Sequence, residues 1–225
     1  IAQRGDGRLL FQGYASCPTL QGATYGARSE LKCYEFNRTY LDPLIQGEPS
    51  TVPLVITNYW NNYLEAPEVR FVSQPGVNDA GVSFSAATYH RQFADTVCAL
   101  ARKRPVYLTR PFPEFPENVP HVMARRLMDD PHSADLRLPV DEYRRRNATV
   151  TAWMEEVHSR CGVHLLDPAP YLCPDGSCMG SYEGRPLYKD RHHLTEYGNR
   201  FLVPMFRQVF EASAPSPAPV VAATP

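Results

Sequence analysis

The chain has 225 residues, of which 43% are hydrophobic and 21% charged, and its formal net charge is -1. This composition is typical of one globular α/β domain, or at most two small ones, and with no basic stripe it gives no reason to expect nucleic acid as a partner. The longest apolar runs are far shorter than a membrane span, and no signal peptide opens the chain.

The first half of the chain is expected to hold two strands and one long helix. Residues 9–15, Leu-Leu-Phe-Gln-Gly-Tyr-Ala, predict a strand that runs into a turn, and helix is expected around residues 30–40. Residues 52–58 are almost continuously apolar, which is typical of a central parallel strand buried on both faces. A loop follows, and apolar residues at helical spacing then predict a helix over roughly residues 84–103.

The second half continues the alternation of strands and helices. Residues 106–109 predict a second core strand, and the four prolines of residues 111–120 predict an extended loop. Apolar spacing then predicts a helix that Gly162 terminates, a short strand over 163–167, and a final helix whose apolar side runs from Leu194 to Val209.

This order predicts a doubly wound parallel sheet with helices on both faces. Right-handed crossovers place the two long helices on one face, and reactive groups gather beyond the carboxyl ends of the strands. Residues 58–60, residues 110–112 and the loop 167–193 are therefore expected at one rim. We expect residues 1–212 to form the domain and residues 213–225, rich in Pro and Ala, to be a tail.

Six cysteines in a chain of this size indicate disulfides and an oxidising compartment. They allow 15 pairings, but two local pairs leave a natural third. The favoured set is Cys17–Cys33, Cys173–Cys178 and Cys98–Cys161. A zinc site is disfavoured because no Cys-x-x-Cys unit occurs and the cysteines are not clustered with histidines. Six reduced, buried cysteines are the alternative.

The strongest chemical signal is an aspartate three residues before a histidine, just ahead of the final helix. The Asp190 carboxylate can accept a hydrogen bond from one ring nitrogen, fix the tautomer and stabilise the imidazolium that forms when the other nitrogen takes a proton. Because His192 and His193 are adjacent, spacing alone does not say which one acts. The alternative is a solvated loop whose histidines bind nothing or cap the helix.

The surrounding block resembles the C-terminal block of SGNH hydrolases. It is most similar to the SGNH domains fused to membrane acyltransferase family 3 proteins, which O-acetylate cell-surface glycans. Residues 16–20 are similar to an early Cys-Pro segment of that family, residues 55–60 to its central strand ending in Trp, and residues 163–168 also fit. The resemblance covers roughly residues 9–210. The residues that carry the block are Leu187, Tyr188, Asp190, His193, Leu194, Thr195 and Gly198.

The resemblance implies an SGNH or flavodoxin-like fold in which Asp190 orients His193, and His193 acts as general base. His192 is then a neighbour in substrate contact, and no metal or organic cofactor is needed. The family takes its nucleophile from Gly-Asp-Ser after the first strand, whereas residues 5–7 here are Gly-Asp-Gly. These precede the expected strand 9–15 directly. Since the chain starts at Ile1 without a methionine, we expect the first strand and the serine upstream.

Two asparagines compete as the donor to the oxyanion. Asn58 ends the central strand, where the family geometry wants a donor, and an amide there could stabilise the oxyanion by on the order of 3 kcal/mol. Asn78 belongs to a literal Gly-x-Asn-Asp run, but that run follows the strand by about twenty residues. A purely structural role is open for both. Trp60 could stack on a sugar or lie in the core, and Arg110 could meet an anionic glycan or be solvated.

The resemblance implies acetyl transfer to a surface glycan, such as lipopolysaccharide, on the periplasmic or extracellular side of a bacterial membrane. A membrane acyltransferase domain in the same protein would supply the acetyl groups. One alternative is an esterase that removes acetyl groups from glycans and uses the same residues. The other is a non-catalytic glycan-binding module, whose signature would be Gly7 lying against His193.

Overall fold

The centre of the fold is a three-stranded parallel sheet. The computed structural model describes residues 9–25, 32–65, 69–71, 85–130 and 135–211. The sheet contains β2 (Leu54–Ile56), β4 (Val106–Thr109) and β6 (His164–Leu166) in the order β2-β4-β6. The parallel α/β fold predicted from the sequence is therefore confirmed.

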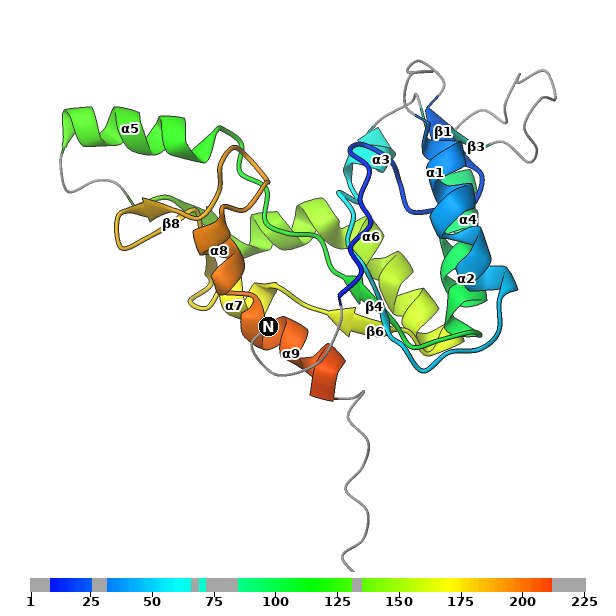
Figure 1. Cartoon of the computed structure of the whole chain (residues 1–225). Helices are drawn as coiled ribbons and strands as arrows, with labels where there is room; N and C mark the ends of the chain where they lie inside the picture. Colours follow the sequence, from blue (N-terminus) through cyan, green and yellow to red (C-terminus); the bar gives the residue numbers. More distant parts are fainter. Residues whose placement is uncertain (1–8, 26–31, 66–68, 72–84, 131–134, 212–225) are drawn as a thin grey trace, which may run out of the picture.

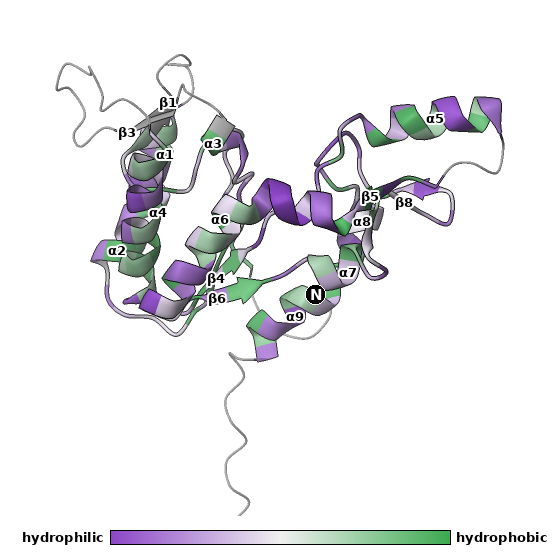
Figure 2. Cartoon of the chain, turned by 180° about the vertical axis from the view of Figure 1, so that it is seen from behind, coloured by the Kyte–Doolittle hydropathy of each residue, from purple (hydrophilic) through white to green (hydrophobic). Residues whose placement is uncertain are grey.

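Two long helices cover one face of this sheet. They are α4 (Ala86–Ala101) and α6 (Val140–Cys161), which pack side by side (Figure 1). Phe93 and Met154 from these helices form one core with the buried strand residues Ile56, Val106 and Leu108. Burial of these apolar side chains is the main force that holds the layer together. Figure 2 shows the hydrophobic strands β4 and β6 and the hydrophilic beginning of α6.

The C-terminal helices cover part of the other face. Here α9 (Val203–Glu211) contributes Met205 and Val209 to a second core that includes Tyr107 and Leu166 of the sheet. The sequence predicted one final helix, but α8 (Glu196–Arg200) and α9 are separate. Pro204 lies in the first turn of α9, where its missing N–H is tolerated, whereas it would break a continuous helix.

None of the described helices is long and apolar enough to cross a bilayer.

Short elements surround these layers. The small sheets pair β1 with β3, β5 with β7 and β8 with β9, all antiparallel. The remaining bounds are β1 Ala23–Tyr25, α1 Cys33–Tyr40, α2 Asp42–Gln46, α3 Asn62–Glu65, β3 Val69–Phe71, α5 Val119–Asp129, β5 Arg137–Pro139, α7 Ala169–Leu172, β7 Ser177–Met179, β8 Ser181–Tyr182 and β9 Arg185–Pro186.

Two local predictions were wrong. Residues 9–14 are not a strand, and Leu9, Leu10 and Phe11 are 82–83% exposed. An apolar segment becomes a strand only when a neighbour takes its backbone hydrogen bonds, and no strand of the described residues pairs with this one. The proline-rich loop also ends sooner than predicted. Asn118 caps α5 by accepting from the His121 N–H at 3.1 Å, and Pro120 lies in the first turn.

The structure pairs the six cysteines in the way that the sequence favours. Disulfides join Cys17 to Cys33, Cys98 to Cys161 and Cys173 to Cys178. The second of these links the ends of α4 and α6 across 63 residues of sequence, beside the left-handed Gly162 (φ 72°) that ends α6. It therefore ties the ends of the two helices of this layer to each other.

The long-range disulfide is expected to contribute most to stability. Closing a loop of 63 residues restricts the unfolded chain more than closing one of 5, by about 2 kcal/mol in the loop-entropy model. The double variant Cys98→Ala/Cys161→Ala should therefore lose more free energy of unfolding in urea than its control Cys173→Ala/Cys178→Ala. Equal losses would contradict this account.

Candidate active site

The turn that carries Asp190 and His193 is closed at its base by backbone hydrogen bonds. The Lys189 N–H donates to the His193 carbonyl at 2.9 Å, and Tyr188 pairs with Leu194 in an isolated antiparallel bridge. Tyr188 is fully buried, so the turn rises from the second core. The short exposed loop is thus held by a rigid base.

The turn also docks on the segment that follows β4. The Phe115 N–H donates to the Arg191 carbonyl at 2.9 Å, and the Val119 N–H donates to the Asp190 carbonyl at 3.1 Å. In return, Arg191 Nε donates to the Phe115 carbonyl at 3.1 Å. These bonds place the turn near the carboxyl ends of the parallel strands, where α/β folds assemble their sites.

Gly198 allows the final block of the motif to pack closely. Thr195 caps α8 by accepting from the Gly198 N–H at 3.0 Å, and its own N–H donates to the Leu187 carbonyl at 2.8 Å. A Cβ at position 198 would lie 2.2 Å from that carbonyl oxygen. The glycine in the motif is therefore required by this close contact with the backbone of Leu187, which follows β9 and leads into the turn.

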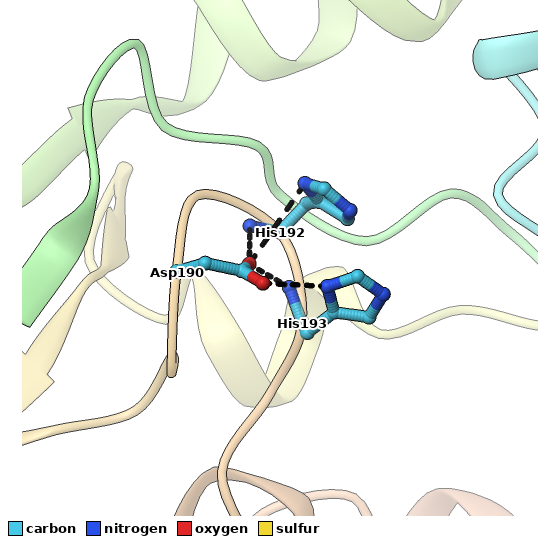
Figure 3. A group of neighbouring side chains, drawn as sticks. All are labelled: Asp190, His192 and His193. Atoms are coloured by element: carbon cyan, nitrogen blue, oxygen red, sulfur yellow. Dashed lines mark hydrogen bonds and ion pairs between the residues drawn. The ribbon is translucent and has the colours of Figure 1, made fainter.

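Asp190 and His193 form a hydrogen-bonded pair. Asp190 Oδ2 lies 2.7 Å from His193 Nδ1, and Oδ1 accepts the backbone N–H of His192 at 2.9 Å and of His193 at 2.8 Å (Figure 3). With the carboxylate ionised, Nδ1 carries the proton and Nε2 has a free lone pair. This is the tautomer that a general base needs.

The pKa of Asp190 lies well below its ordinary value. Burial by itself raises this pKa, but the hydrogen bonds from the backbone N–H groups of His192 and His193, followed by the bond from the His193 ring, lower it by more. The carboxylate is therefore ionised throughout the neutral range and keeps His193 in one orientation. Among the described residues, no serine hydroxyl forms a hydrogen bond with the His193 ring, whose side chain is 56% exposed.

His192 lies beside the dyad, with its ring centroid 4.1 Å from that of His193, and it stacks on Tyr59. The centroids of the two stacked rings are 4.3 Å apart, and the planes differ by 16°. The pKa of His192 is lowered, mainly by burial and then by the charge of His193. The charges of Asp190 and Glu114 raise this pKa, but by less. His192 is therefore favoured in its neutral form, in which it can both donate and accept a hydrogen bond.

The structure places Asn58 at the end of β2, with its amide already bonded. In the orientation that satisfies both ends of the amide, it donates to the Thr57 carbonyl at 3.1 Å and to Thr19 Oγ1 at 3.0 Å and accepts from the Thr19 N–H at 3.3 Å. The amide thus holds the segment around Thr19 against the strand end. Asn78, the competing candidate, lies outside the described residues.

The sugar-stacking role considered for Trp60 is not compatible with its position. Its side chain is buried, its indole N–H donates to the Thr109 carbonyl at 2.8 Å, and its ring meets Phe93 edge to face. A ring enclosed in this way offers no face to a sugar. Trp60 is therefore a core residue that joins β4 to α4.

Arg110 follows β4, but its charge is already paired. Its guanidinium forms an ion pair with Glu155 of α6, and its backbone N–H donates to the Leu166 carbonyl at 2.9 Å. The pair lines an open hollow of about 470 Å³ together with His158 and His164. Arg110 thus presents a polar but largely neutralised surface.

Asp190, His192 and His193 are also the group of the described residues whose donor atoms come close enough to hold a cation, all within 4.8 Å. Both Asp190 oxygens, however, already accept hydrogen bonds from within the turn. The carboxylate is therefore arranged to orient a histidine rather than to ligate a metal.

The parallel sheet, with an Asp–His pair near the carboxyl ends of its strands, defines an α/β domain of the SGNH-like class. The chain belongs to the family of SGNH domains fused to AT3 domains, whose family model matches residues 1–208. The resemblance noted in the sequence is therefore confirmed. No curated protein sequence gives a significant match.

One solved structure shares the fold. It is the periplasmic domain of a lipopolysaccharide acetyltransferase from Salmonella ser. Paratyphi A, with a TM-score of 0.56 and 13% sequence identity. The match covers 87% of this chain and 69% of that chain. At this identity the likeness establishes the fold and leaves the activity to be argued from the site.

Three residues around the dyad were missed as site residues by the sequence analysis. Tyr59, Glu114 and Arg146 lie in segments separated by 55 and 32 residues, and they form a hydrogen-bonded group beside His192. Glu114 lies in the proline-rich segment 111–120, for which the sequence predicted only an extended loop. Only the buried position of Glu114, which sequence spacing does not encode, distinguishes it.

Replacing Gly198 with alanine should destabilise the base of the turn. The new methyl group would clash with the Leu187 backbone, and forcing such a shift costs roughly 1–3 kcal/mol. Urea unfolding should show this loss for Gly198→Ala and almost none for Glu196→Ala, whose side chain on the same helix is 85% exposed. A neutral Gly198→Ala variant would contradict the close packing.

His192 should make stability fall on acidification. Because its folded pKa lies below the ordinary 6.5, the unfolded chain binds the proton more readily, and the contribution present above about pH 6.5 is lost as the pH falls through the folded pKa. Between about pH 7.5 and pH 5, His192→Gln should lose less free energy of unfolding than wild type, by up to about 1.4 kcal/mol per pH unit. Identical pH slopes would show that His192 is not desolvated.

Proposed function

We propose that this domain transfers an O-acyl group, specifically acetyl, to a cell-surface glycan on the extracytoplasmic side of a bacterial membrane. In this proposal His193 is the general base and Asp190 the carboxylate of a Ser–His–Asp triad. The observation that carries the proposal is the 2.7 Å contact that leaves His193 Nε2 free. The 225 residues contain no Gly-Asp-Ser run, so the serine is proposed to lie outside them.

The reaction would proceed in two balanced steps. The serine hydroxyl gives its proton to His193 Nε2 as its oxygen bonds to the acetyl carbonyl carbon, and the imidazolium returns the proton to the leaving group of the donor. A glycan hydroxyl then gives its proton to His193 while attacking the acetyl-enzyme, and the proton passes to the released serine. Asp190 stabilises each imidazolium. This scheme uses no metal or organic cofactor.

Three further residues have proposed roles. Asn58 is the candidate donor to the oxyanion, which requires its amide to exchange a Thr19 or Thr57 contact for the reacting oxygen. His192, neutral and beside the dyad, is the candidate contact for the acceptor hydroxyl. Arg110 is the candidate contact for more distant parts of the glycan through the hollow that it lines.

The family and the structural neighbour support the cellular setting. Fusion of the family's SGNH domains to AT3 domains supports a membrane acyltransferase domain as the partner that supplies acetyl groups. The neighbour is a periplasmic domain of a lipopolysaccharide acetyltransferase, which makes lipopolysaccharide the first glycan to test. Three disulfides fit an oxidising compartment. Residues 1–212 are proposed as the domain, with residues 213–225 as a tail.

A glycan acetyl-esterase is the second candidate. It would use the same dyad, and the 56% exposure of the His193 side chain favours it because water can reach the base. A non-catalytic glycan-binding module is the third possibility from the sequence. Its signature residue, Gly7, lies outside the described residues.

The test is acetylation of the surface glycan by the full-length protein that carries this domain. His193→Ala should lower the rate by roughly 10²- to 10⁴-fold, the usual effect of losing a general base, and Asp190→Asn should also lower it strongly by favouring the wrong tautomer. His121→Ala, an exposed histidine on α5, is the matched control and should leave the rate unchanged.

Free acetate released from an acetylated glycan, without any gain of acetyl groups, would identify an esterase. Unchanged acetylation in His193→Ala would overturn the catalytic proposal, and the binding module would then be favoured.

A further inference from the structure

An ion pair with a buried carboxylate lies next to Tyr59, the residue that stacks on His192. The Glu114 side chain is 4% exposed, and its Oε2 accepts from Arg146 Nη2 at 2.9 Å and Nε at 3.2 Å. The same oxygen accepts from the Tyr59 hydroxyl at 2.7 Å, and Oε1 accepts from Asn61 Nδ2 at 3.3 Å. A buried carboxylate persists only with such a full set of donors.

The network joins three distant parts of the fold. Asn61 follows β2, Glu114 follows β4, and Arg146 comes from the hydrophilic beginning of α6 (Figure 2). Asn61 also donates to Asn147 Oδ1, and Asn147 donates to the Tyr143 carbonyl at 2.7 Å. A buried network of polar groups contributes little to stability compared with apolar packing. The network is therefore better explained by the side chain that it holds in place.

The network holds the ring of Tyr59. Burial, followed by the hydrogen bond and charge of Glu114, raises the pKa of Tyr59 to about 12, so its hydroxyl stays protonated and donates to Glu114. The ring stacks on His192, whose own ring centroid lies 4.1 Å from that of His193. Tyr59 thus links the ion pair to His192, whose ring lies beside that of the exposed His193.

We propose that Tyr59, fixed by the Glu114–Arg146 pair, is a positioning residue that supports the catalytic turn through His192. Asp190 restrains His193 from one side, and the Tyr59–His192 stack restrains the same turn from the other. This inference rests on the proposed role of His193 and adds a support from another strand end. Positioning of this kind acts on the rate of the chemical step rather than on substrate binding.

The first measurement uses the 225-residue chain and needs no enzymatic activity. In NMR titrations, Tyr59→Leu should raise the pKa of His192 toward 6.5 because the stacked ring no longer buries it, while Tyr59→Phe keeps the ring and should preserve the wild-type titration. Glu114→Gln removes a charge that raises the pKa of His192 and should lower it. Tyr40→Leu, at an exposed tyrosine on α1, is the control.

The second measurement is acetyl transfer by the full-length protein. Tyr59→Leu should lower kcat by up to about 10²-fold with little change in KM, and Tyr59→Phe should restore most of the loss. Glu114→Gln, which keeps the side-chain volume, should lower kcat in the same direction and serves if Tyr59→Leu does not fold. The inference is overturned if Tyr59→Leu titrates like wild type, or if its kcat matches that of Tyr40→Leu.

The two proposals fail in different ways. If His193→Ala retained transfer, the triad would be wrong whatever the Tyr59 variants did. If His193→Ala abolished transfer while the Tyr59 and Glu114 variants kept wild-type kcat and titrations, the triad would stand and the positioning role would be lost.

Discussion

Three hydrogen bonds to the Asp190 carboxylate are the interaction on which the site depends. Two come from the backbone N–H groups of His192 and His193 and one from the His193 ring, so a single side chain shapes the turn and orients that ring. The low pKa that results keeps the carboxylate charged, and the charge keeps one tautomer. Local structure and chemistry are therefore set by the same atoms.

The rest of the fold positions that turn near the carboxyl ends of the parallel strands. Parallel strands place the segments after β2 and β4 together, and backbone bonds from Phe115 and Val119 draw the turn onto them. The helical layer, tied by Cys98–Cys161, supplies Arg146 to the ion pair beneath. Residues more than a hundred positions apart in sequence, such as Tyr59 and His192, thereby come into contact.

Periodicity predicted the parts of the fold whose cause is local. Helical spacing located α4 and α6, apolar runs located the three strands of the sheet, and two local cysteine pairs left Cys98 and Cys161 as partners. The segment 9–15 has a strand-like pattern, but no strand of the described residues pairs with it, and a sequence pattern does not reveal whether such a neighbour exists. Trp60 stands at a strand end, and only packing against Phe93 places it in the core. Nothing in the sequence around Glu114 distinguishes it from a surface glutamate, and only its burial in the fold marks it as part of the network.

The same contrast applies to the site. Asp190 and His193 are three residues apart, so their pairing could be inferred from spacing, whereas the stack of Tyr59 on His192 depends on tertiary structure. The assignment of His193 over His192 came from the family resemblance. The structure adds a physical difference, because His193 bonds Asp190 at 2.7 Å while His192 Nδ1 lies 3.9 Å from it.

The most direct test of the central claim is to trap the residue that His193 is proposed to activate. The full-length protein would be treated with a fluorophosphonate, which forms a covalent adduct with activated serines, and the adduct would be mapped by mass spectrometry. The account predicts one adduct on a serine outside these 225 residues, in a Gly-Asp-Ser setting, that disappears in His193→Ala. An adduct on a serine within the 225 residues, or one that persists without His193, would contradict it.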